Sequence, residues 1–414
     1  MAYISELVLV INCGSSSLKF SVIPASGGGP LASGLAECLG RPEARIVLKS
    51  ADTKTVNSLH GGSHDSALAA ILRYLAEQRL LDRIVVVGHR VVHGGERFSA
   101  SALVTPEVIA DIEAVAALAP LHNPANLLGI RACAQGLPAI PQVVVFDTAF
   151  HQTIAAAAFT YAIPQRLYRD QGVRRYGFHG TSHRYIAGQT VELLRLDPQD
   201  HGIVIAHLGN GASATAVSNG ESVDTTMGMT PLEGLVMGTR SGDIDFGVVA
   251  HVARTNRLSL DEVETMLNTQ SGLLGISELS GDCRALEQAA QAGHPGAILA
   301  LDVFVHRLAR HIGGLAASLD NFDALVFTGG IGENSALLRA KTIESLRVFG
   351  FTLNREANER TVGGRSGRIS RSRRPTAIVI PTDEEGLIAR DATAILGISP
   401  SGGFPAQPSD LHIA

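Results

Sequence analysis

Arginine and acidic side chains occur in this sequence at positions that suit the handling of a charged substrate. Arg90 and Arg240 lie in glycine-rich segments (88–96 and 237–243), and Asp147 directly follows an apolar run. A guanidinium group can form paired hydrogen bonds with a carboxylate or with a phosphoryl group in transfer. Phosphoryl transfer requires mainly positioning and charge neutralisation. The residue types therefore point to phosphoryl transfer, although a structural salt bridge is the more frequent role of a lone arginine.

Three glycine-rich segments are compatible with phosphate binding. Two of them connect apolar runs in the order strand, Gly/Asn/Ser turn, strand, at residues 7–23 and 203–217, and the third, 328–334, follows the apolar run 324–327. Glycine lacks a Cβ, so such turns can bring backbone N–H groups close to an anion. For one turn alone, a tight hairpin without a ligand is the alternative. The similarity of the first two segments indicates a duplicated fold with a nucleotide held between its halves.

Several common catalytic motifs are missing. The sequence contains no GxxxxGK[ST] P-loop and no GxSxG nucleophile elbow. Residues 209–214 match GxGxx(G/A), but Thr215–Val217 favours a strand where a dinucleotide site requires a helix. The pairs His89/His93 and His179/His183 have the spacing of metal ligands on a helix. Both lie in glycine-rich segments without an HExxH glutamate, so zinc is not predicted.

Length and composition limit the class of protein. The 414 residues exceed what one hydrophobic core usually supports, which predicts two domains. A net charge of −5 argues against nucleic-acid binding, and the basic segment 365–374 is interpreted as a solvated loop. The four cysteines include no CxxC pair, as is usual in a reducing compartment. Without a recognisable signal peptide or membrane span, we expect a soluble, cytoplasmic protein with no membrane partner.

Apolar runs and helical patterns follow one another along the chain and predict an α/β protein. We expect a first domain at 1–150, a second at 151–385, a final helix at about 386–398 that packs back on the first domain, and a disordered tail at 399–414. Helices are predicted at Ser66–Leu81 behind a serine cap, from Thr181 or Ser182 to about Leu194, and at Ala297–Leu319; residues 280–284 are predicted to be a loop. Ligands of open α/β sheets bind at the carboxyl ends of strands, so we expect the site there.

Nine motifs, in order from residue 11 to about residue 390, resemble those of the acetate kinase family. They are INCGSSSLKF (11–20), GHRVVHGGE (88–96), LHNP (121–124), FDTAFH (146–151), YGFHGTSH (176–183), HLGNG (207–211), MGTRSGD (237–243), FTGGIGEN (327–334) and PTDEE (381–385). The resemblance implies an α/β protein of two similar domains with the duplicated actin/ribonuclease-H-like fold and an interdomain active-site cleft. It also implies reversible phosphoryl transfer between ATP and acetate, giving acetyl phosphate and ADP, with Mg²⁺ (Mn²⁺ as an alternative) and a homodimer.

The resemblance assigns expected roles to individual residues. Asn12 and Glu384 would form the metal site. The catalytic residues would be Arg90, Asp147, His179, Arg240 and His122, with Arg90 also binding the substrate carboxylate. The acid would lie in an apolar pocket formed by Val92, Leu121, Phe178 and Pro231. The nucleotide would contact Lys19, His207, Leu208, Gly209, Asn210, Gly211, Asp282, Cys283, Arg284, Gly330, Ile331, Gly332, Glu333 and Asn334.

Two positions depart from the family's pattern, namely Asp383 where Asn is common and Cys283 where Met is common. A carboxylate at Asp383, beside Glu384, can alter the metal preference. Asp147 is the family's assigned acid/base, but acetate has a pKa of about 4 and needs no base at neutral pH. We therefore expect Asp147 to orient a magnesium-bound water or an arginine, and electrostatic stabilisation to dominate the catalysis.

Two alternatives stay open from the sequence. Propionate or butyrate could replace acetate, because the same carboxylate clamp serves any short acid and the pocket gains only about 1–3 kcal/mol per methylene. The acetate kinase family belongs to a larger superfamily, which also includes nucleotide-gated chaperones and actin-like filaments. This sequence has no appended peptide-binding domain, and it carries clamp arginines that such proteins would not need.

Overall fold

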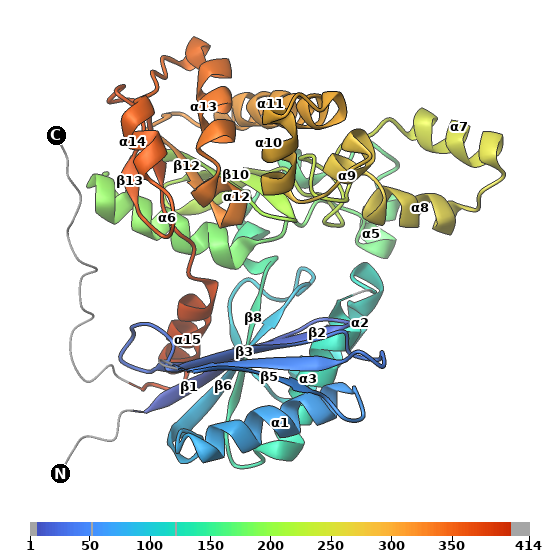
Figure 1. Cartoon of the computed structure of the whole chain (residues 1–414), viewed down its shortest axis with the longest axis vertical. Coiled ribbons are helices and arrows are strands. Elements are labelled where there is room, and N and C mark those ends of the chain that lie inside the picture. Colours follow the sequence, from blue (N-terminus) through green and yellow to red (C-terminus); the bar gives the residue numbers. More distant parts are fainter. Residues whose placement is uncertain (1–5, 51–52, 121, 399–414) are drawn as a thin grey trace. The chain divides into compact units, whose positions relative to one another are not determined.

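The computed structural model describes residues 6–50, 53–120 and 122–398. The chain divides into two compact units. The first unit contains the described residues up to Phe150 together with residues 383–398, and the second is His151–Thr382. Each is built around one β-sheet with helices packed against it (Figure 1). No helix in the described ranges is long and apolar enough to cross a membrane, and the predicted tail at 399–414 lies outside those ranges.

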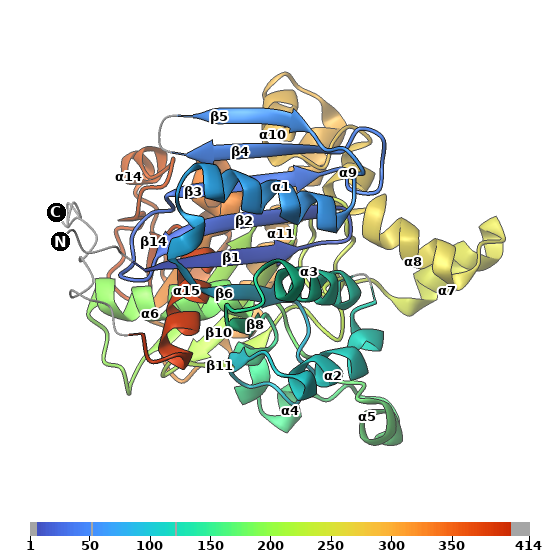
Figure 2. The same cartoon turned by 90° about the horizontal axis from the view of Figure 1, so that it is seen from below.

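The sheet of the first unit has the strand order β5-β4-β3-β2-β1-β6-β8-β7 (Figure 2). Its strands are β1 (Leu7–Cys13), β2 (Ser17–Pro24), β3 (Ala32–Glu37), β4 (Arg45–Ser50), β5 (Lys54–Ser58), β6 (Ile84–Val91), β7 (Ala102–Leu103) and β8 (Gln142–Phe146). Strands β1 to β5 pair antiparallel in sequence order, whereas β6 runs parallel to β1 and β8 runs parallel to β6. The carboxyl ends of β1, β6 and β8 therefore lie at one edge of the sheet.

Helices cover both faces of this sheet. The odd-numbered residues of β1 from Leu7 to Ile11 belong to a core with α1 (His64–Glu77) and α3 (Asn123–Gly136). The even-numbered Val8 and Val10 belong to a second core with α15 (Glu384–Ile395). Because both faces are buried, the strand is apolar without alternation. A third apolar cluster joins β6 and β8 to α2 (Pro106–Ala114).

The last helix of the described chain, α15, packs on the first unit's sheet. It reaches β6 so closely that a Cβ on Gly88 would lie 2.6 Å from Cγ2 of Ile388. Glycine is therefore needed at this position of β6 for the helix to dock. The docking places Asp383, Glu384 and Glu385, at the amino end of α15, in the same unit as Arg90 and Asp147.

The sheet of the second unit has the order β11-β10-β9-β12-β14-β13. Its strands are β9 (Gly202–Leu208), β10 (Ala212–Ser218), β11 (Glu221–Thr225), β12 (Ala324–Thr328), β13 (Gly367–Arg368) and β14 (Thr376–Val379). The order β11-β10-β9-β12-β14 repeats β3-β2-β1-β6-β8, with the same antiparallel and parallel pairings. The prediction of a duplicated actin/ribonuclease-H-like α/β fold is thereby confirmed.

The helices of the second unit include α11 (Pro295–Ala316), which at 22 residues was predicted nearly correctly as Ala297–Leu319. Both α11 and α6 (Gly180–Leu194) pack against the sheet. The others are α4 (Ala156–Phe159), α5 (Arg166–Gln171), α7 (Phe246–Asn256), α8 (Leu260–Thr269), α9 (Gly272–Ser277), α10 (Cys283–Gln291), α12 (Gly329–Asn334), α13 (Ala336–Ser345) and α14 (Arg355–Arg360).

Three local predictions were wrong about where helices begin. The cap of α1 is Ser63, and Ser66 completes a reciprocal capping box with it. Helix α6 begins after His179, whose left-handed backbone (φ 56°) forms the N-cap, so Thr181 and Ser182 lie inside the first turn. Residues 280–284 are not wholly a loop, since Asp282 caps α10 at Cys283.

Candidate active site

Arg90 and Asp147 form the charged centre of the first unit. Arg90 lies at the end of β6, and Asp147 directly follows β8, where its backbone N–H donates to the Val91 carbonyl at 3.0 Å. The guanidinium Nε is 3.0 and 3.1 Å from the two carboxylate oxygens of Asp147, and Nη2 is 2.6 Å from Oδ2. Asp147 is 1% exposed. The carboxylate thus engages one edge of the guanidinium, which is the contact expected of a residue that orients an arginine.

The electrostatic surroundings keep Arg90 positively charged. Burial acts to lower the pKa of Arg90, but the charges of Asp147 and Glu384, with the hydrogen bond to Asp147, outweigh burial and raise it. The carboxylate of Glu384 lies 3.9 Å from Nε of Arg90. The predicted acid-binding, catalytic and metal-binding residues Arg90, Asp147 and Glu384 are therefore neighbours.

Lys19 and Asn12 occupy paired positions on neighbouring strands, because Asn12 of β1 is the register partner of Lys19 of β2. The ammonium of Lys19 lies 2.6 Å from Oε1 of Glu385, whose other oxygen accepts a hydrogen bond from Ser21. Glu385 was not among the predicted site residues, although it belongs to the PTDEE motif. The predicted nucleotide contact Lys19 is thus linked to the amino end of α15.

The oxygen donors of Asn12 and Glu384 suit a hard cation. Mg²⁺ usually takes one or two protein carboxylates and completes its shell with waters and substrate phosphates. No group of three or more His, Cys, Asp or Glu that could hold a metal occurs in the described part of the chain. The departure at Asp383 has a structural use, because its Oδ1 accepts from the Gly386 N–H at 2.9 Å and caps α15. An asparagine at position 383 would cap the helix equally well.

Two buried asparagines on α3 hold the segment that follows Arg90. Asn126 accepts from the Val92 N–H at 3.1 Å and donates to the Cys13 carbonyl at 2.7 Å, and Asn123 bonds both backbone groups of His93. The predicted catalytic His122 is the N-cap residue of α3. Leu121, predicted for the acid pocket, lies outside the described residues. Asn126 was missed, although an asparagine amid the apolar positions of a helix is a detectable signal.

Histidines are grouped at the carboxyl end of β9 in the second unit. His179 lies against His207, with ring centroids 4.5 Å apart. Serine hydroxyls hold both rings: Ser213 Oγ is 2.9 Å from His179 Nδ1, and Ser182 Oγ is 2.8 Å from His207 Nδ1. Neither serine was among the predicted site residues. Ser213 is the detectable one, because it is a polar residue between alanines in a buried strand.

Arg240 is a partly buried cation that has no carboxylate partner among the described residues. Its Nη1 donates to the Pro231 carbonyl at 3.2 Å and contacts Met237 Sδ at 3.8 Å. No acidic side chain among the described residues lies within ion-pair distance, and burial lowers its pKa without any opposing charge. A desolvated cation of this kind is suited to an incoming anion. The sequence left open that Arg240 forms a structural salt bridge. Among the described residues, Arg240 forms none.

His179 and Arg240 face one point beside the β9–β10 turn. The position that a Cβ on Gly211 would occupy is 3.4 Å from His179 Nε2 and 3.5 Å from Arg240 Nη1. Because residue 211 is glycine, the space between the two nitrogen-bearing groups is open. Two of the predicted catalytic side chains are therefore brought together in this unit.

The predicted nucleotide-binding segments lie next to one another. The Gly238 N–H donates to the Asn210 carbonyl at 3.1 Å, and a Cβ on Gly238 would lie 3.1 Å from the Gly281 carbonyl. Near the end of α12, Glu333 accepts from the N–H groups of Gly329, at the start of the helix, and Thr382. Asp282 is used as a helix cap, and burial raises the pKa of the Cys283 thiol to about 12. The Gly238 backbone thus lies between Asn210 and Gly281, the residue before the Asp282–Arg284 segment.

Phe178 and Pro231 were predicted to line the acid pocket. Phe178 is 2% exposed, and its carbonyl accepts from His151 Nε2 at 3.0 Å, just before His179. Pro231 adjoins Arg240 through its carbonyl.

The pair His89 and His93 is not on a metal-binding helix, since His89 lies within β6 against Gln142 and burial lowers the pKa of both histidines to about 4.

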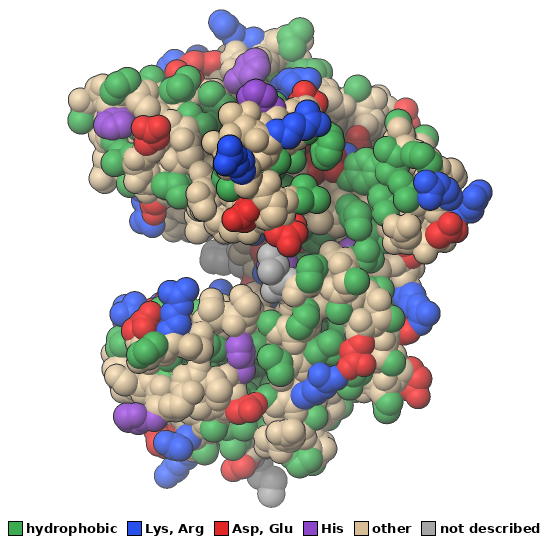
Figure 3. All heavy atoms as spheres, turned by 90° about the vertical axis from the view of Figure 1, so that its right-hand side faces the viewer, with side chains coloured by type: hydrophobic (Ala, Val, Ile, Leu, Met, Phe, Trp, Pro, Cys, Tyr) green, Lys and Arg blue, Asp and Glu red, His purple; other side chains and the backbone are tan. Residues whose placement is uncertain are grey.

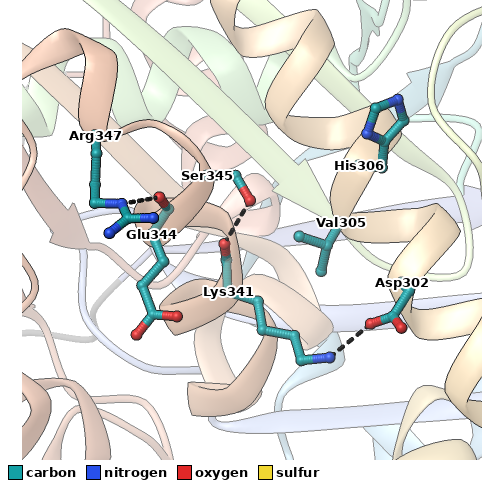
Figure 4. Close-up of a pocket in the computed structure, with 7 residues that line it drawn as sticks. All are labelled: Asp302, Val305, His306, Lys341, Glu344, Ser345 and Arg347. Atoms are coloured by element: carbon teal, nitrogen blue, oxygen red, sulfur yellow. Dashed lines mark hydrogen bonds and ion pairs between the residues drawn. The ribbon is translucent and has the colours of Figure 1, made fainter.

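A separate pocket lies between α11 and α13 in the second unit (Figure 4). Its lining residues are Asp302, Val305, His306, Lys341, Glu344, Ser345 and Arg347. Lys341 Nζ is 2.6 Å from Asp302 Oδ1, and Arg347 Nε donates to the Glu344 carbonyl at 3.0 Å. Lys341 and Arg347 already interact with Asp302 and Glu344, and none of the lining residues belongs to the predicted site. We therefore assign this pocket no role in the chemistry.

Comparison with known proteins places this arrangement in a family. The sequence matches the acetokinase family over residues 7–390. A propionate kinase from Yersinia enterocolitica is 54% identical, covering 94% of this chain and 95% of that protein, and an acetate kinase from Shewanella frigidimarina is 52% identical, covering 94% and 98%. The crystal structure of acetate kinase from Porphyromonas gingivalis has a TM-score of 0.90 at 43% identity, covering 95% of this chain and 100% of that one. Likeness of this extent confirms what the motifs predicted: the chain belongs to the acetokinase family.

Proposed function

We propose that the chain catalyses reversible phosphoryl transfer between ATP and acetate, giving acetyl phosphate and ADP. The observation that carries the proposal is Arg240, a partly buried cation whose described surroundings supply no carboxylate, beside His179 and a glycine turn. A phosphoryl group in transfer would provide the missing negative charge. As ATP is the phosphoryl donor, we place the protein in the cytoplasm.

The first unit would bind the acid. Asp147 engages Nε and Nη2 of Arg90, which leaves the guanidinium oriented and charged for a second carboxylate. Acetate is ionised at neutral pH, so no residue has to remove a proton before attack. Val92, His122 and Arg90 would set the acid's position, while Asn12 and Glu384 would hold Mg²⁺ or Mn²⁺. The metal, when bound, would neutralise charge on the phosphates.

The second unit would bind the nucleotide through the backbone-lined segments at His207–Gly211, Asp282–Arg284 and Gly330–Asn334. Lys19 is proposed as a further nucleotide contact. His179 and Arg240 would donate to the phosphoryl oxygens as charge develops on them, which is electrostatic stabilisation without a covalent enzyme intermediate.

A coupled assay for ADP release tests the function. It compares acetate, propionate, butyrate and no acid, each with Mg²⁺, with Mn²⁺ and with a chelator. Acetate-dependent release that the chelator abolishes is the expected result. Release without any acid would favour a nucleotide-gated protein, and a preference for propionate would favour the second candidate, which the Yersinia relative's name supports.

Replacing Val92 with alanine is expected to change the preference among acids. Val92 is held beside Arg90 by the hydrogen bond from its N–H to Asn126, so its side chain has a fixed place near the acid clamp. Removing two methyl groups should raise kcat/KM for propionate relative to acetate by roughly 10-fold if one methylene is accommodated. The ratio is measured with both acids in the same assay, and an unchanged ratio would show that Val92 does not line the pocket.

Replacing Arg90 with alanine is expected to raise the KM for acetate by about 10- to 100-fold, since a hydrogen-bonded charged partner of the carboxylate is lost. The change should fall mainly on KM, because the contact exists in the ground state as well as in the transition state. Alanine alone would remove the guanidinium that the buried Asp147 carboxylate engages, so the measurement is repeated in the Asp147→Asn background. A KM within two-fold of the background variant would argue against Arg90 as the clamp.

A homodimer is the assembly we propose, with α7 in the contact. In the described chain none of the eleven residues of α7 is buried, and Phe246 at its start is 73% exposed. Ile244, Val248 and Leu260 are further exposed apolar side chains on or next to α7 and α8. Figure 3 faces the side toward which α7 extends in Figure 1 and shows hydrophobic side chains at the surface of the second unit. An exposed apolar group of this kind favours association with a second copy.

Replacing Phe246 with glutamate is therefore expected to give a monomer of 43.4 kDa, where the wild type has twice this mass. Light scattering after gel filtration measures the mass. The matched control is Val348→Glu, which changes an apolar residue outside α7 and α8 that is 87% exposed and should leave the dimer intact. Dissociation by both variants, or by neither, would contradict a contact through α7.

A further inference from the structure

A buried serine connects His179 to a second histidine. Ser213 on β10 is fully buried, and its Oγ is 2.9 Å from His179 Nδ1 and 2.8 Å from His183 Nε2. His179 is the N-cap of α6 and His183 lies one turn further along the same helix, also fully buried. The hydroxyl therefore bridges the two rings in a chain from His183 through Ser213 to His179.

The number of protons in this chain is limited. His183 is neutral, because burial lowers its pKa well below the usual value, and the rings of His151 and His207, at 5.8 and 6.3 Å, lower it further. A neutral imidazole carries one N–H and one bare nitrogen, and a serine hydroxyl carries one proton. Nδ1 of His183 is buried and has no hydrogen-bond partner in the described part of the chain.

Three arrangements of these protons satisfy the two short contacts. If His179 donated from Nδ1 and Ser213 donated to His183, the proton of His183 would be on Nδ1, as a buried N–H without a partner. If both histidines donated to Ser213, its hydroxyl proton would have no acceptor. If His183 donates from Nε2 and Ser213 donates to His179 Nδ1, the only unpaired group is the bare Nδ1 of His183. Unpaired buried N–H groups are rarer than under-satisfied acceptors, so the third arrangement is favoured.

We propose that Ser213 and His183 are positioning residues that fix the tautomer of His179, keeping its single proton on Nε2. The chain of hydrogen bonds runs from His183 Nε2 to Ser213 Oγ and from there to His179 Nδ1. Nε2 of His179 then carries a hydrogen on the side of Gly211, where Arg240 Nη1 approaches the same point. Two N–H donors thereby face the place where negative charge would develop.

The catalytic meaning of this tautomer rests on the proposed function, but the tautomer itself can be measured without it. ¹⁵N-histidine is incorporated into the full chain, and the ring-nitrogen shifts of His179 are recorded near neutral pH without substrate, with assignment from the spectrum of His179→Ala. The expected result is a protonated Nε2 and a bare Nδ1. A proton on Nδ1, or on both nitrogens, would overturn the proposal whether or not the protein phosphorylates acetate.

The variant Ser213→Ala tests the bridge. Loss of the hydroxyl should convert His179 to a mixture of tautomers and lower kcat on the order of 10-fold, as for a residue that orients a functional side chain, with the KM values little changed. Ser370→Ala is the matched control, because the buried Ser370 hydroxyl accepts from the Ala377 N–H at 2.8 Å on β14, a strand without any predicted site residue. It should leave the His179 shifts and kcat unchanged. A single His179 tautomer in Ser213→Ala identical to that of the wild type would overturn the proposal. If Ser213→Ala does not fold, the wild-type spectrum still decides.

Discussion

Replacement of Arg240 with alanine should lower kcat by about 10³-fold, close to 4 kcal/mol of activation free energy, with little change in either KM. The guanidinium is partly buried, and its described contacts are to a carbonyl and a thioether, with no carboxylate among them. Its interaction with an anion is therefore not weakened by a competing countercharge. Charge on the phosphoryl oxygens grows as the bond to the leaving group breaks, so the benefit falls on the transition state.

Steady-state kinetics in both directions measure this loss. Lysine at position 240 should rescue poorly, since an ammonium is a point charge and cannot form paired bonds to two oxygens. Guanidinium added to the alanine variant should restore part of the rate. Arg360→Ala, which removes an exposed arginine paired with Glu356 on α14, is the control and should keep full activity. A folded Arg240→Ala enzyme with kcat within a few-fold of wild type would exclude the transition-state role.

The central strands could be predicted from the sequence because their burial leaves an unambiguous pattern. In β1, β8, β9 and β12 nearly every residue is buried, so the apolar runs coincide with the strands. Helix starts were less predictable, since several neighbouring residues can cap. At α6 the chain turns through a left-handed histidine, a conformation that residue type alone does not indicate.

The sequence motifs predicted the candidate site residues but not the residues that position them. Arg90, Asp147 and Glu384 are far apart in sequence, and parallel strands with a docked C-terminal helix bring them together. The residues that position the site, such as Asn126 beside Arg90 and Ser213 beside His179, each form two hydrogen bonds from a buried position. Their polar character is visible in the sequence, but their partners depend on tertiary packing, which local patterns do not encode.

Replacement of Arg339 with methionine should reduce the free energy of unfolding by about 3–5 kcal/mol, the range found when one member of a buried polar network is removed. Arg339 on α13 is 1% exposed, and burial lowers its pKa to about 10, so it remains charged at neutral pH. Its three nitrogens donate to Asn358 Oδ1 and to the carbonyls of Gly332, Glu333, Asn358 and Thr361. Methionine fills a similar volume but leaves these acceptors buried and unpaired.

The position of α12 depends on the same contacts, because Gly332 and Glu333 belong to the predicted nucleotide-binding segment. Arg339→Met should therefore also raise the KM for ATP more than the KM for acetate. Lysine should give an intermediate loss of stability, since its three donors cannot reach acceptors arranged around a planar guanidinium. Arg355→Met, which removes an exposed ion pair with Glu344, is the control and should change stability by no more than about 0.5 kcal/mol. Denaturant unfolding measures all three variants. If Arg339→Met unfolds like the control, the buried guanidinium does not hold α12, and a change in the KM for ATP would need another cause.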